Sequence, residues 1–364
     1  MILSDKNIPF IFEALNSKCP TIVLPANEIN NYILKNNSIT HLFIRSTVKV
    51  NKDLLLGTDV VFIATSTSGI DHLDINYLQS NNIAYFSAPG SNANSVAEYV
   101  VYTILKWQNE IKCNLNKKRI GIIGYGNIGK LVAEHSNALG LEVWINDPPL
   151  FDFGAKFPEF VKHKELEEIF ENCDIITNHV PLTLTGKYST YKLLNQDLLM
   201  KLKENALLIH TSRGGVLDET SLVDKIKQSR IFVAIDVWEN EPDFNPFLVE
   251  NSLIATPHLA GYSYDGKLKG AMQVLKHFQN FTGIIPDYSI FDEEMKGIKL
   301  KTIKEFESNL QIAKTIDNNR KFESDFDNFK LFCNLTIFER KKVFQEIRRN
   351  YPKRRECLTI NGCN

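Results

Sequence analysis

The stretch Arg119-Ile-Gly-Ile-Ile-Gly-Tyr-Gly-Asn-Ile-Gly-Lys130 decides the fold of this chain. A short apolar run leads directly into a Gly-x-Gly-x-x-Gly turn, and the helical pattern 130–134 follows the turn. In such a unit Gly124 permits the tight turn, Gly126 lets the backbone approach a pyrophosphate, and Gly129 allows close packing of helix on strand. The N-terminus of the helix then offers N–H groups and a positive dipole end to phosphates. The stretch therefore predicts a strand–turn–helix unit that binds a dinucleotide.

An acidic residue in the right place extends this prediction. Asp147 ends the next apolar run, Glu142-Val-Trp-Ile-Asn146, and lies 23 residues beyond Gly124. A carboxylate in this position accepts hydrogen bonds from an adenosine ribose. A 2′-phosphate would meet a like charge there, and Pro148-Pro149 provides no arginine to neutralise it. We therefore expect NAD rather than NADP. In the alternative interpretation, the glycines only turn a corner and Asp147 caps a loop.

Apolar runs of strand length recur on both sides of this unit, with helical patterns between them. Such continuous runs are typical of parallel strands that are covered on both faces. The first series is 21–24, 41–44, 60–64 and 83–86, and the second is 119–123, 142–146, 174–177, 206–209, 231–235 and 253–255. The expected fold class is α/β, with a doubly wound, parallel-sheet NAD-binding domain (Rossmann type) inserted in a flavodoxin-like substrate domain.

Two changes of composition divide the chain. The segment 88–95 is small and polar and precedes a long helical pattern, which indicates a domain boundary. From about residue 286 the chain becomes rich in lysine and phenylalanine and has few strand signals. We expect a substrate-binding domain at 1–93 and 266–285, a NAD-binding domain at 94–265, and a C-terminal α/β domain at 286–364.

Composition and charge exclude several classes of protein. The chain has 364 residues, 43% of them hydrophobic and 23% charged, which is typical of a globular protein of two or three domains. Its formal net charge of −1 gives no overall field that would attract nucleic acid or an anionic membrane. Eight basic residues between Arg340 and Arg355 face only Glu346; we interpret them as solvated helix faces with a subunit contact. Nucleic-acid binding by this basic segment is a minor alternative.

The six cysteines form no Cys-x-x-Cys pair, which argues against a zinc site and against a disulfide framework. Charged residues at Asp5 and Lys6 lie where a signal peptide needs its apolar stretch, and no apolar run approaches the roughly 20 residues that span a bilayer. We expect a cytoplasmic protein without a metal and without a membrane partner.

Three polar residues follow strands of the second series, where an open parallel sheet presents its ligand crevice. Arg213, Glu241 and His258 come after the runs 206–209, 231–235 and 253–255. An arginine binds a substrate carboxylate with its planar fork, and a histidine takes a hydroxyl proton while hydride leaves the same carbon. A carboxylate bonded to that histidine orients it. The set suits the oxidation of a 2-hydroxy acid.

Each residue taken singly has an ordinary structural explanation. An arginine after a strand is commonly a surface ion pair, a glutamate a helix cap, and a histidine a satisfied structural residue. Their repeated position behind successive strands of an expected NAD domain is what favours catalysis.

Four strings resemble the signatures of the D-isomer-specific 2-hydroxyacid dehydrogenases. They are Gly124-Tyr-Gly-Asn-Ile-Gly129, His210-Thr-Ser-Arg-Gly-Gly215, Asp236-Val-Trp-Glu-Asn-Glu-Pro242 and Thr256-Pro-His-Leu-Ala-Gly261. The resemblance implies that Arg213, Glu241 and His258 are catalytic, with Glu241 rather than Glu239 as the acid. It implies cofactor contacts at Gly124, Gly126, Asn127, Ile128, Gly129, Asp147, Val180, Thr211, Asp236 and Gly261.

Further strings, among them 44–51, 65–72 and 258–267, resemble members of this family that act on a phosphorylated 2-hydroxy acid. The segment Arg348-Arg-Asn-Tyr-Pro-Lys-Arg-Arg-Glu356 resembles part of their additional C-terminal dimerisation domain, which implies a homodimer. The substrate contacts that follow from the resemblance are Ser46, Thr67, Gly69 and Tyr262, with Arg45 and Lys49 as cations for the phosphate. Another phosphorylated acid such as 3-phosphoglycerate, and a non-catalytic NAD-sensing regulator of the same fold, are the alternatives.

Two positions depart from the family pattern. His210 places a second histidine near the site, at the end of its strand, and Val180 occupies a position where a threonine is common. Any contact of residue 180 with NAD must then come from its backbone.

Overall fold

The computed structural model describes residues 1–360 and divides the chain into two compact units. The first unit comprises residues 1–92 and 263–298, and the second comprises 93–262 and 299–364. Each unit is built around one wholly parallel sheet, in the order β2-β1-β3-β4-β5 for the first and β12-β11-β10-β9-β6-β7-β8 for the second. The expected α/β fold class with a doubly wound sheet is confirmed.

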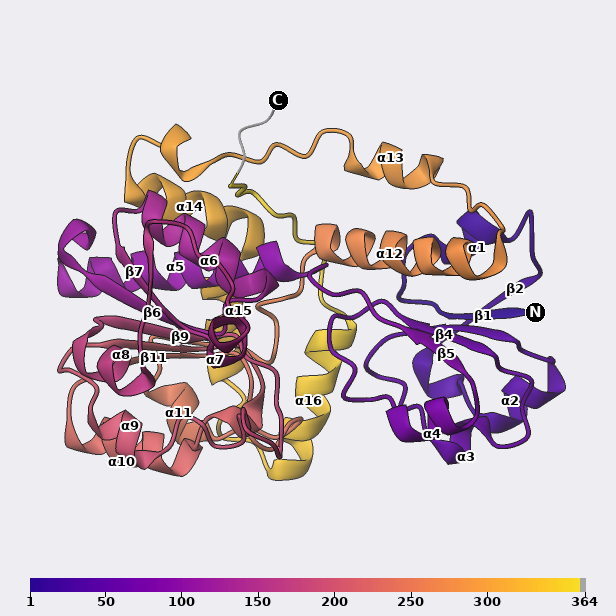
Figure 1. The fold of residues 1–364 in the computed structure, drawn as a ribbon, viewed down its shortest axis with the longest axis horizontal. Coiled ribbons are helices and arrows are strands. Elements are labelled where there is room, and N and C mark those ends of the chain that lie inside the picture. Colours follow the sequence, from indigo (N-terminus) through magenta and orange to yellow (C-terminus); the bar gives the residue numbers. More distant parts are fainter. Residues whose placement is uncertain (361–364) are drawn as a thin grey trace. The chain divides into compact units, whose positions relative to one another are not determined.

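In the first unit, helices cover both faces of the five-stranded sheet (Figure 1). Its strands are β1 (Ile2–Asp5), β2 (Thr21–Leu24), β3 (His41–Ile44), β4 (Phe62–Thr65) and β5 (Ala84–Phe86). Its helices are α1 (Ile11–Leu15), η1 (Ala26–Glu28), α2 (Asn31–Asn36), α3 (Lys52–Leu55), α4 (Ile75–Ser80), α12 (Tyr264–Thr282) and α13 (Ser289–Met295). The helices α1, α12 and α13 contribute to one apolar core, and α2, α3 and α4 contribute to the core on the opposite face.

The second unit holds the glycine turn. Its strands are β6 (Arg119–Ile123), β7 (Glu142–Asn146), β8 (Val161–His163), β9 (Ile175–Asn178), β10 (Leu207–His210), β11 (Phe232–Ile235) and β12 (Ile254–Ala255). Its helices up to residue 262 are α5 (Ala93–Ile111), η2 (Leu115–Lys117), α6 (Asn127–Ala138), α7 (Pro148–Asp152), α8 (Leu166–Asn172), α9 (Gln196–Met200), η3 (Gly214–Val216), α10 (Glu219–Gln228) and α11 (Pro246–Glu250). The helices α5 and α6 lie on one face of the sheet, and α9 and α10 lie on the other (Figure 1). The strands are buried on both faces because both faces are covered.

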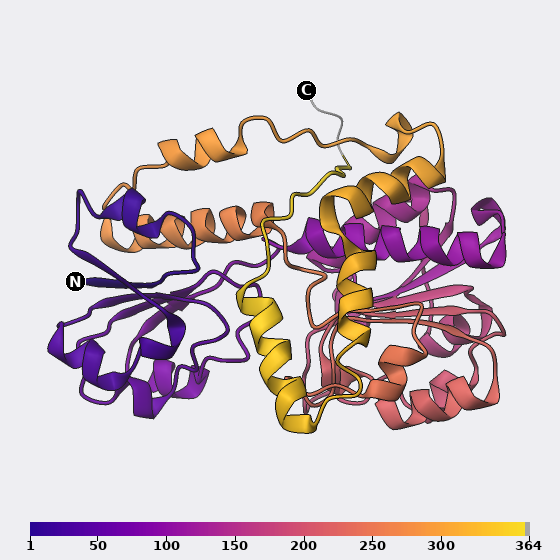
Figure 2. The same cartoon turned by 180° about the vertical axis from the view of Figure 1, so that it is seen from behind.

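The segment after residue 298 packs into the second unit and is largely helical. Its elements are η4 (Ile303–Glu305), α14 (Asn309–Arg320), α15 (Phe322–Lys330) and α16 (Ile337–Arg349), with one isolated parallel bridge between Lys301 and Leu358. The helix α14 packs on α5 (Figure 2), and α15 packs beside β12. The phenylalanines that mark this segment in the sequence enter the core of the second unit, namely Phe322, Phe326, Phe329 and Phe344.

The observed units differ from the expected domains in two places. Residues 286–298 belong to the first unit, because Phe291 of α13 is fully buried in the core that α1 and α12 share. Residues 299–360 form one unit with the nucleotide-binding sheet, because their aromatic side chains complete its core. Within residues 299–360 the strand content is limited to the bridge at Lys301, so the described part of this segment has little of the expected sheet. A role of the segment in dimer formation stays a prediction.

Candidate active site

The expected catalytic residues all follow neighbouring strands of the second unit. Arg213 comes after β10, Glu241 after β11 and His258 after β12, and these three strands are consecutive in the sheet. Because the strands are parallel, their carboxyl ends meet at one edge of the sheet, where ligands bind in open α/β sheets.

Glu241 and His258 are in direct contact. The ring nitrogen Nδ1 of His258 lies 3.0 Å from Oε1 and 2.9 Å from Oε2 of Glu241. A carboxylate only accepts hydrogen bonds, so this contact assigns the proton to Nδ1 and leaves Nε2 as the basic nitrogen. Burial opposes ionisation of Glu241, but the charge and hydrogen bond of His258, the charge of Arg348 and the N–H of Trp238 together lower the pKa of Glu241.

The backbone around His258 is held by a buried carboxylate. His258 has a φ of 59°, in the left-handed region, and its N–H donates to the carbonyl of Asp236 at 2.7 Å. Oδ1 of Asp236 accepts from the N–H groups of Leu259 and Ala260 and from the hydroxyl of Thr256. Burial raises the pKa of Asp236. Asp236 therefore holds the backbone of the loop that carries His258. The expected contact of Asp236 with NAD stays a prediction.

Arg213 is positioned by a close backbone crossing. A Cβ on Gly214 would lie 1.9 Å from the carbonyl oxygen of Trp238, so only glycine lets the segment after β10 approach the segment after β11. Arg213 is half-buried beside this crossing, and its Nη1 donates to the carbonyl of Ser212 at 2.9 Å. The arginine therefore lies on the segment that touches the loop of Glu241.

His210, the second histidine near the site, belongs to a buried hydrogen-bond network at the ends of β9 and β10. Nδ1 of His210 lies 2.8 Å from Nδ2 of Asn178, and Oδ1 of Asn178 accepts from the hydroxyl of Ser212. Burial lowers the pKa of His210 to about 3, so this histidine is neutral at physiological pH. The sequence reasoning did not single out Asn178, whose role becomes visible only when β9 and β10 are paired.

The glycine turn between β6 and α6 has the properties that the sequence predicts. Gly124 has a φ of 89°, and a Cβ on Gly129 would lie 2.1 Å from the carbonyl oxygen of Gly124. A Cβ on Gly126 would meet nothing within 4 Å, so this position faces open space. Gly126 caps α6 without a side-chain hydrogen bond, and Asn127 and Ile128 form the first turn of that helix.

The other expected cofactor residues surround this turn or lie on the segments that follow the strands. The carboxylate of Asp147 accepts from the N–H of Tyr125 at 2.7 Å and from the N–H of Leu150 at 3.1 Å. A Cβ on Gly124 would lie 3.0 Å from Cγ1 of Val180, which places Val180 against the turn. The hydroxyl of Thr211 lies 3.3 Å from Nδ1 of His179.

These residues fit a dinucleotide. The open cradle at Gly126 and the first turn of α6 would hold the pyrophosphate, and the carboxylate of Asp147 ends β7 where a ribose is bound in such folds. Gly261 lies in the loop that follows His258 and is half-buried there.

The expected substrate contacts other than Tyr262 lie in the first unit. Nε of Arg45 lies 3.0 Å from Oδ2 of the buried Asp5, so a carboxylate already compensates part of this charge. Thr67 donates its hydroxyl to the carbonyl of Gly69 at 3.2 Å. Ser46 and Lys49 are exposed.

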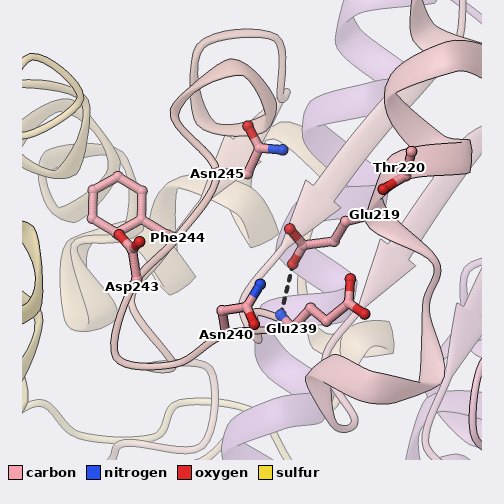
Figure 3. A pocket seen from close by; sticks show the side chains of 7 residues that line it. All are labelled: Glu219, Thr220, Glu239, Asn240, Asp243, Phe244 and Asn245. Carbon is pink, nitrogen blue, oxygen red and sulfur yellow. Dashed lines mark hydrogen bonds between the residues drawn. The ribbon is translucent and has the colours of Figure 1, made fainter. Parts of the chain in front are cut away.

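A separate pocket of about 250 Å³ explains why Glu239 and Glu241 differ. Its lining residues are Glu219, Thr220, Glu239, Asn240, Asp243, Phe244 and Asn245 (Figure 3). The N–H of Glu239 donates to Glu219 at 2.7 Å, and the carboxylate of Glu239 lies 3.6 Å from Nζ of Lys192. Glu239 thus belongs to an acidic surface pocket, whereas Glu241 contacts His258.

Residues 1–360 contain no group of three or more histidine, cysteine, aspartate or glutamate side chains that could hold a metal ion. No helix in this part of the chain is long and apolar enough to cross a membrane.

Comparison with known proteins agrees with the fold and with the family resemblance of the motifs. Residues 95–260 match the family described as "D-isomer specific 2-hydroxyacid dehydrogenase, NAD binding domain". The chain belongs to the D-isomer specific 2-hydroxyacid dehydrogenases, which are NAD-dependent enzymes, and the resemblance seen in its motifs is confirmed.

Its relatives within this family carry one particular name. An erythronate-4-phosphate dehydrogenase of Wigglesworthia glossinidia brevipalpis is 37% identical over 99% of this chain and 93% of its own length. An erythronate-4-phosphate dehydrogenase of Bacteroides fragilis is 36% identical over 98% of this chain and 97% of its own length. The similarity therefore includes the C-terminal segment.

Solved structures share the fold over a smaller part of the chain. A D-lactate dehydrogenase from Aquifex aeolicus, in complex with NAD and lactic acid, superimposes with a TM-score of 0.62 at 23% identity and covers 82% of this chain and 98% of its own. An acyclic imino acid reductase in complex with NADPH and D-Arg gives a TM-score of 0.66 at 23% identity over 79% of this chain and 98% of its own.

Proposed function

We propose that this enzyme oxidises 4-phospho-D-erythronate at C2 to 2-oxo-3-hydroxy-4-phosphobutanoate, with NAD as the cofactor, in the biosynthesis of pyridoxal 5′-phosphate (vitamin B6). The observation that carries the proposal is the contact of Glu241 with His258 at the edge of the sheet that also bears an open glycine turn. Relatives with the name erythronate-4-phosphate dehydrogenase, similar over nearly the whole chain, support this choice of substrate.

The three catalytic residues divide the work between them. Nε2 of His258 takes the proton of the C2 hydroxyl, because Nδ1 is already protonated toward Glu241. The carboxylate of Glu241 holds the ring in this tautomer and stabilises the imidazolium that forms. The guanidinium of Arg213 binds the C1 carboxylate in a bidentate manner and polarises the C2 oxygen. A bound NAD would supply the acceptor for the hydride that leaves C2, while the electron pair of the O–H bond completes the carbonyl.

The residues that the family resemblance predicts as substrate contacts carry suitable polar groups. Ser46, Thr67 and Tyr262 each offer a hydroxyl donor for a substrate oxygen, and the backbone near Gly69 offers N–H groups for a carboxylate. Arg45, whose charge Asp5 already compensates in part, is a supporting cation rather than the main one.

Comparing two phosphorylated acids tests the substrate. We expect NADH absorbance to appear with 4-phospho-D-erythronate and NAD, and kcat/KM for 3-phosphoglycerate to be far lower. Efficient oxidation of 3-phosphoglycerate without oxidation of 4-phospho-D-erythronate would contradict the proposal. A NAD-sensing regulator would show no turnover of either acid, and His258→Ala would leave its partner binding unchanged.

We also propose that the enzyme acts in the cytoplasm as a homodimer joined by residues 299–364. The similarity of the C-terminal segment to that of full-length relatives supports this assembly. Sedimentation equilibrium of the full chain tests it, and a monomer at micromolar concentration would contradict it.

A further inference from the structure

Arg348 of α16 lies over the aromatic ring of Tyr262, one of the predicted substrate contacts. Its guanidinium carbon is 5.4 Å from the centre of the Tyr262 ring and 5.8 Å from the centre of the Phe344 ring. Tyr262 is four residues beyond His258, on the loop that Asp236 anchors. The C-terminal segment thus brings a cation to the loop of the catalytic histidine.

Arg348 differs from Arg340 and Arg354 of this segment, which both have an acidic partner. Arg340 lies 2.9 Å from Asp243, and Arg354 lies 3.6 Å from Asp325. Within residues 1–360 no carboxylate lies within ion-pair distance of Arg348. Its Nε is buried and has no hydrogen-bond partner in the same part of the chain. A half-buried cation without a partner is costly, and a bound anion would offset that cost.

The charge of Arg348 also acts on the catalytic pair. Its charge is close enough to lower the pKa of Glu241, although the two groups form no ion pair. The ring of Tyr351 packs edge-on against Tyr262 with centroids 5.8 Å apart, and the hydroxyl of Tyr351 donates to Asp325 at 2.6 Å. Arg348 at the end of α16 and Tyr351 just beyond it therefore both contact Tyr262, on the loop that follows His258.

We propose that Arg348 binds the phosphate group of the substrate and so determines the preference for a phosphorylated acid. This inference rests on the proposed function. Arg213, on the segment after β10, serves the carboxylate, and the dianion at the other end of the molecule needs a cation of its own. A guanidinium offers two parallel N–H groups to phosphate oxygens, and the ring of Tyr262 keeps the guanidinium plane oriented.

The test compares substrates that differ only in the phosphate. For Arg348→Gln we expect the ratio of kcat/KM for 4-phospho-D-erythronate to kcat/KM for D-erythronate to fall by about 10–100-fold, the range of a lost charged hydrogen bond. Arg348→Lys keeps the charge but loses the planar pair of N–H groups, and we expect its ratio to lie between those of the wild type and Arg348→Gln. Arg349→Gln removes the neighbouring exposed arginine and should leave the ratio at its wild-type value.

Two outcomes would overturn the inference. An equal loss on both acids would mean that Arg348 acts only through the charge of Glu241, and an unchanged ratio would mean that the phosphate is bound elsewhere. If Arg348→Gln does not fold, as judged by circular dichroism, Arg348→Lys carries the comparison.

A binding measurement separates this inference from the proposed function. Calorimetric titration with inorganic phosphate should give weaker binding to Arg348→Lys or Arg348→Gln than to the wild type, whether or not 4-phospho-D-erythronate is oxidised. Equal affinity in wild type and variants would overturn the role of Arg348. If the wild type oxidises 3-phosphoglycerate instead, the proposed function fails, and the ratio is measured with 3-phosphoglycerate and glycerate.

Discussion

The carboxylate of Glu98 and the guanidinium of Arg320 form an ion pair at 2.9 Å, and both side chains are completely buried. Glu98 lies on α5, and Arg320 ends α14. Arg320 also donates to the carbonyls of Ala260 and Tyr262, at 3.2 Å each. Through this pair the C-terminal segment supports the loop that carries His258.

Removing one member of the pair should destabilise the protein strongly. We expect Glu98→Gln or Arg320→Met to lower the free energy of unfolding by about 3–5 kcal/mol, because the remaining charge is buried without compensation. The double variant should lose less than the sum of the two single losses. Urea denaturation followed by circular dichroism measures these values, and additive losses would contradict a coupled pair.

Two glycines of the turn should respond differently to alanine. Gly126→Ala should keep the thermal midpoint, because the new methyl group meets no protein atom, but should raise the KM for NAD. We expect a rise of about tenfold or more, equivalent to about 1.4 kcal/mol of binding. Gly129→Ala should lower the midpoint, because its methyl group would overlap the carbonyl of Gly124. Calorimetry measures the thermal midpoint, and titration with NAD measures the KM. The prediction would be contradicted if both variants changed the same quantity to the same extent.

Glu241 and Glu239, which both follow β11, should differ in their effect on kcat/KM. Glu241→Gln should lower kcat/KM by about 10²–10⁴-fold, because the ring of His258 loses the carboxylate that fixes its tautomer. Glu239→Gln is the matched control, since Glu239 lines the separate pocket and its carboxylate lies 3.6 Å from Nζ of Lys192. Steady-state rates measure both, and a comparable loss in Glu239→Gln would contradict this assignment.

The charge of Asp147 should set the cofactor preference. We expect the wild type to have a much lower KM for NAD than for NADP, and Asp147→Asn to reduce that ratio by about tenfold, because the like charge facing a 2′-phosphate is removed. Asparagine retains an acceptor for the N–H of Leu150, so the cap of α7 persists. An unchanged preference would show that another residue selects the cofactor.

Buried histidines should make the protein sensitive to acid. Burial lowers the pKa of His135 to about 4 and that of His210 to about 3, and both are at most 1% exposed. An unfolded histidine titrates near pH 6.5, so below that pH the unfolded state binds more protons and the folded state loses stability. We expect each histidine to cost about 2 kcal/mol at pH 5 relative to pH 8.

Denaturation across this pH range measures the loss. His135→Leu removes one of these groups at a site away from the catalytic loop, and should reduce the loss of stability between pH 8 and pH 5 by about 2 kcal/mol. If the free energy of unfolding depended on pH equally in the wild type and the variant, burial of His135 would not be a cause of the acid sensitivity.

The sequence predicts the cofactor turn and most of the strands, because long apolar runs and glycine spacing are local signals. It does not reveal β1, which buries Ser4 and Asp5 and offers only Ile2 and Leu3 as an apolar run. It also misses the edge strand β8, whose middle residue Lys162 is exposed. Short strands are defined by the neighbours they pair with rather than by their own composition.

The sequence predicts only part of the candidate site, because some of its residues are also defined by neighbours that are distant in the sequence. The order of Arg213, Glu241 and His258 behind successive strands points to an active site, and the structure shows that Glu241 touches His258. The roles of Arg320 and Arg348 depend on contacts with residues far away in the sequence. In a linear reading they are two of many charges on amphipathic helices, and nothing local distinguishes the fully buried Arg320.

The bonds from Arg320 to the loop of His258 also set an order of events during protein synthesis. Ala260 leaves the ribosome 60 residues before the arginine that holds its carbonyl. At translation speeds of about 5–20 residues per second, this delay lasts about 3–12 s. During that interval the nascent catalytic loop lacks the hydrogen bonds from Arg320, so this support of the loop forms only after α14 has been synthesised and has docked.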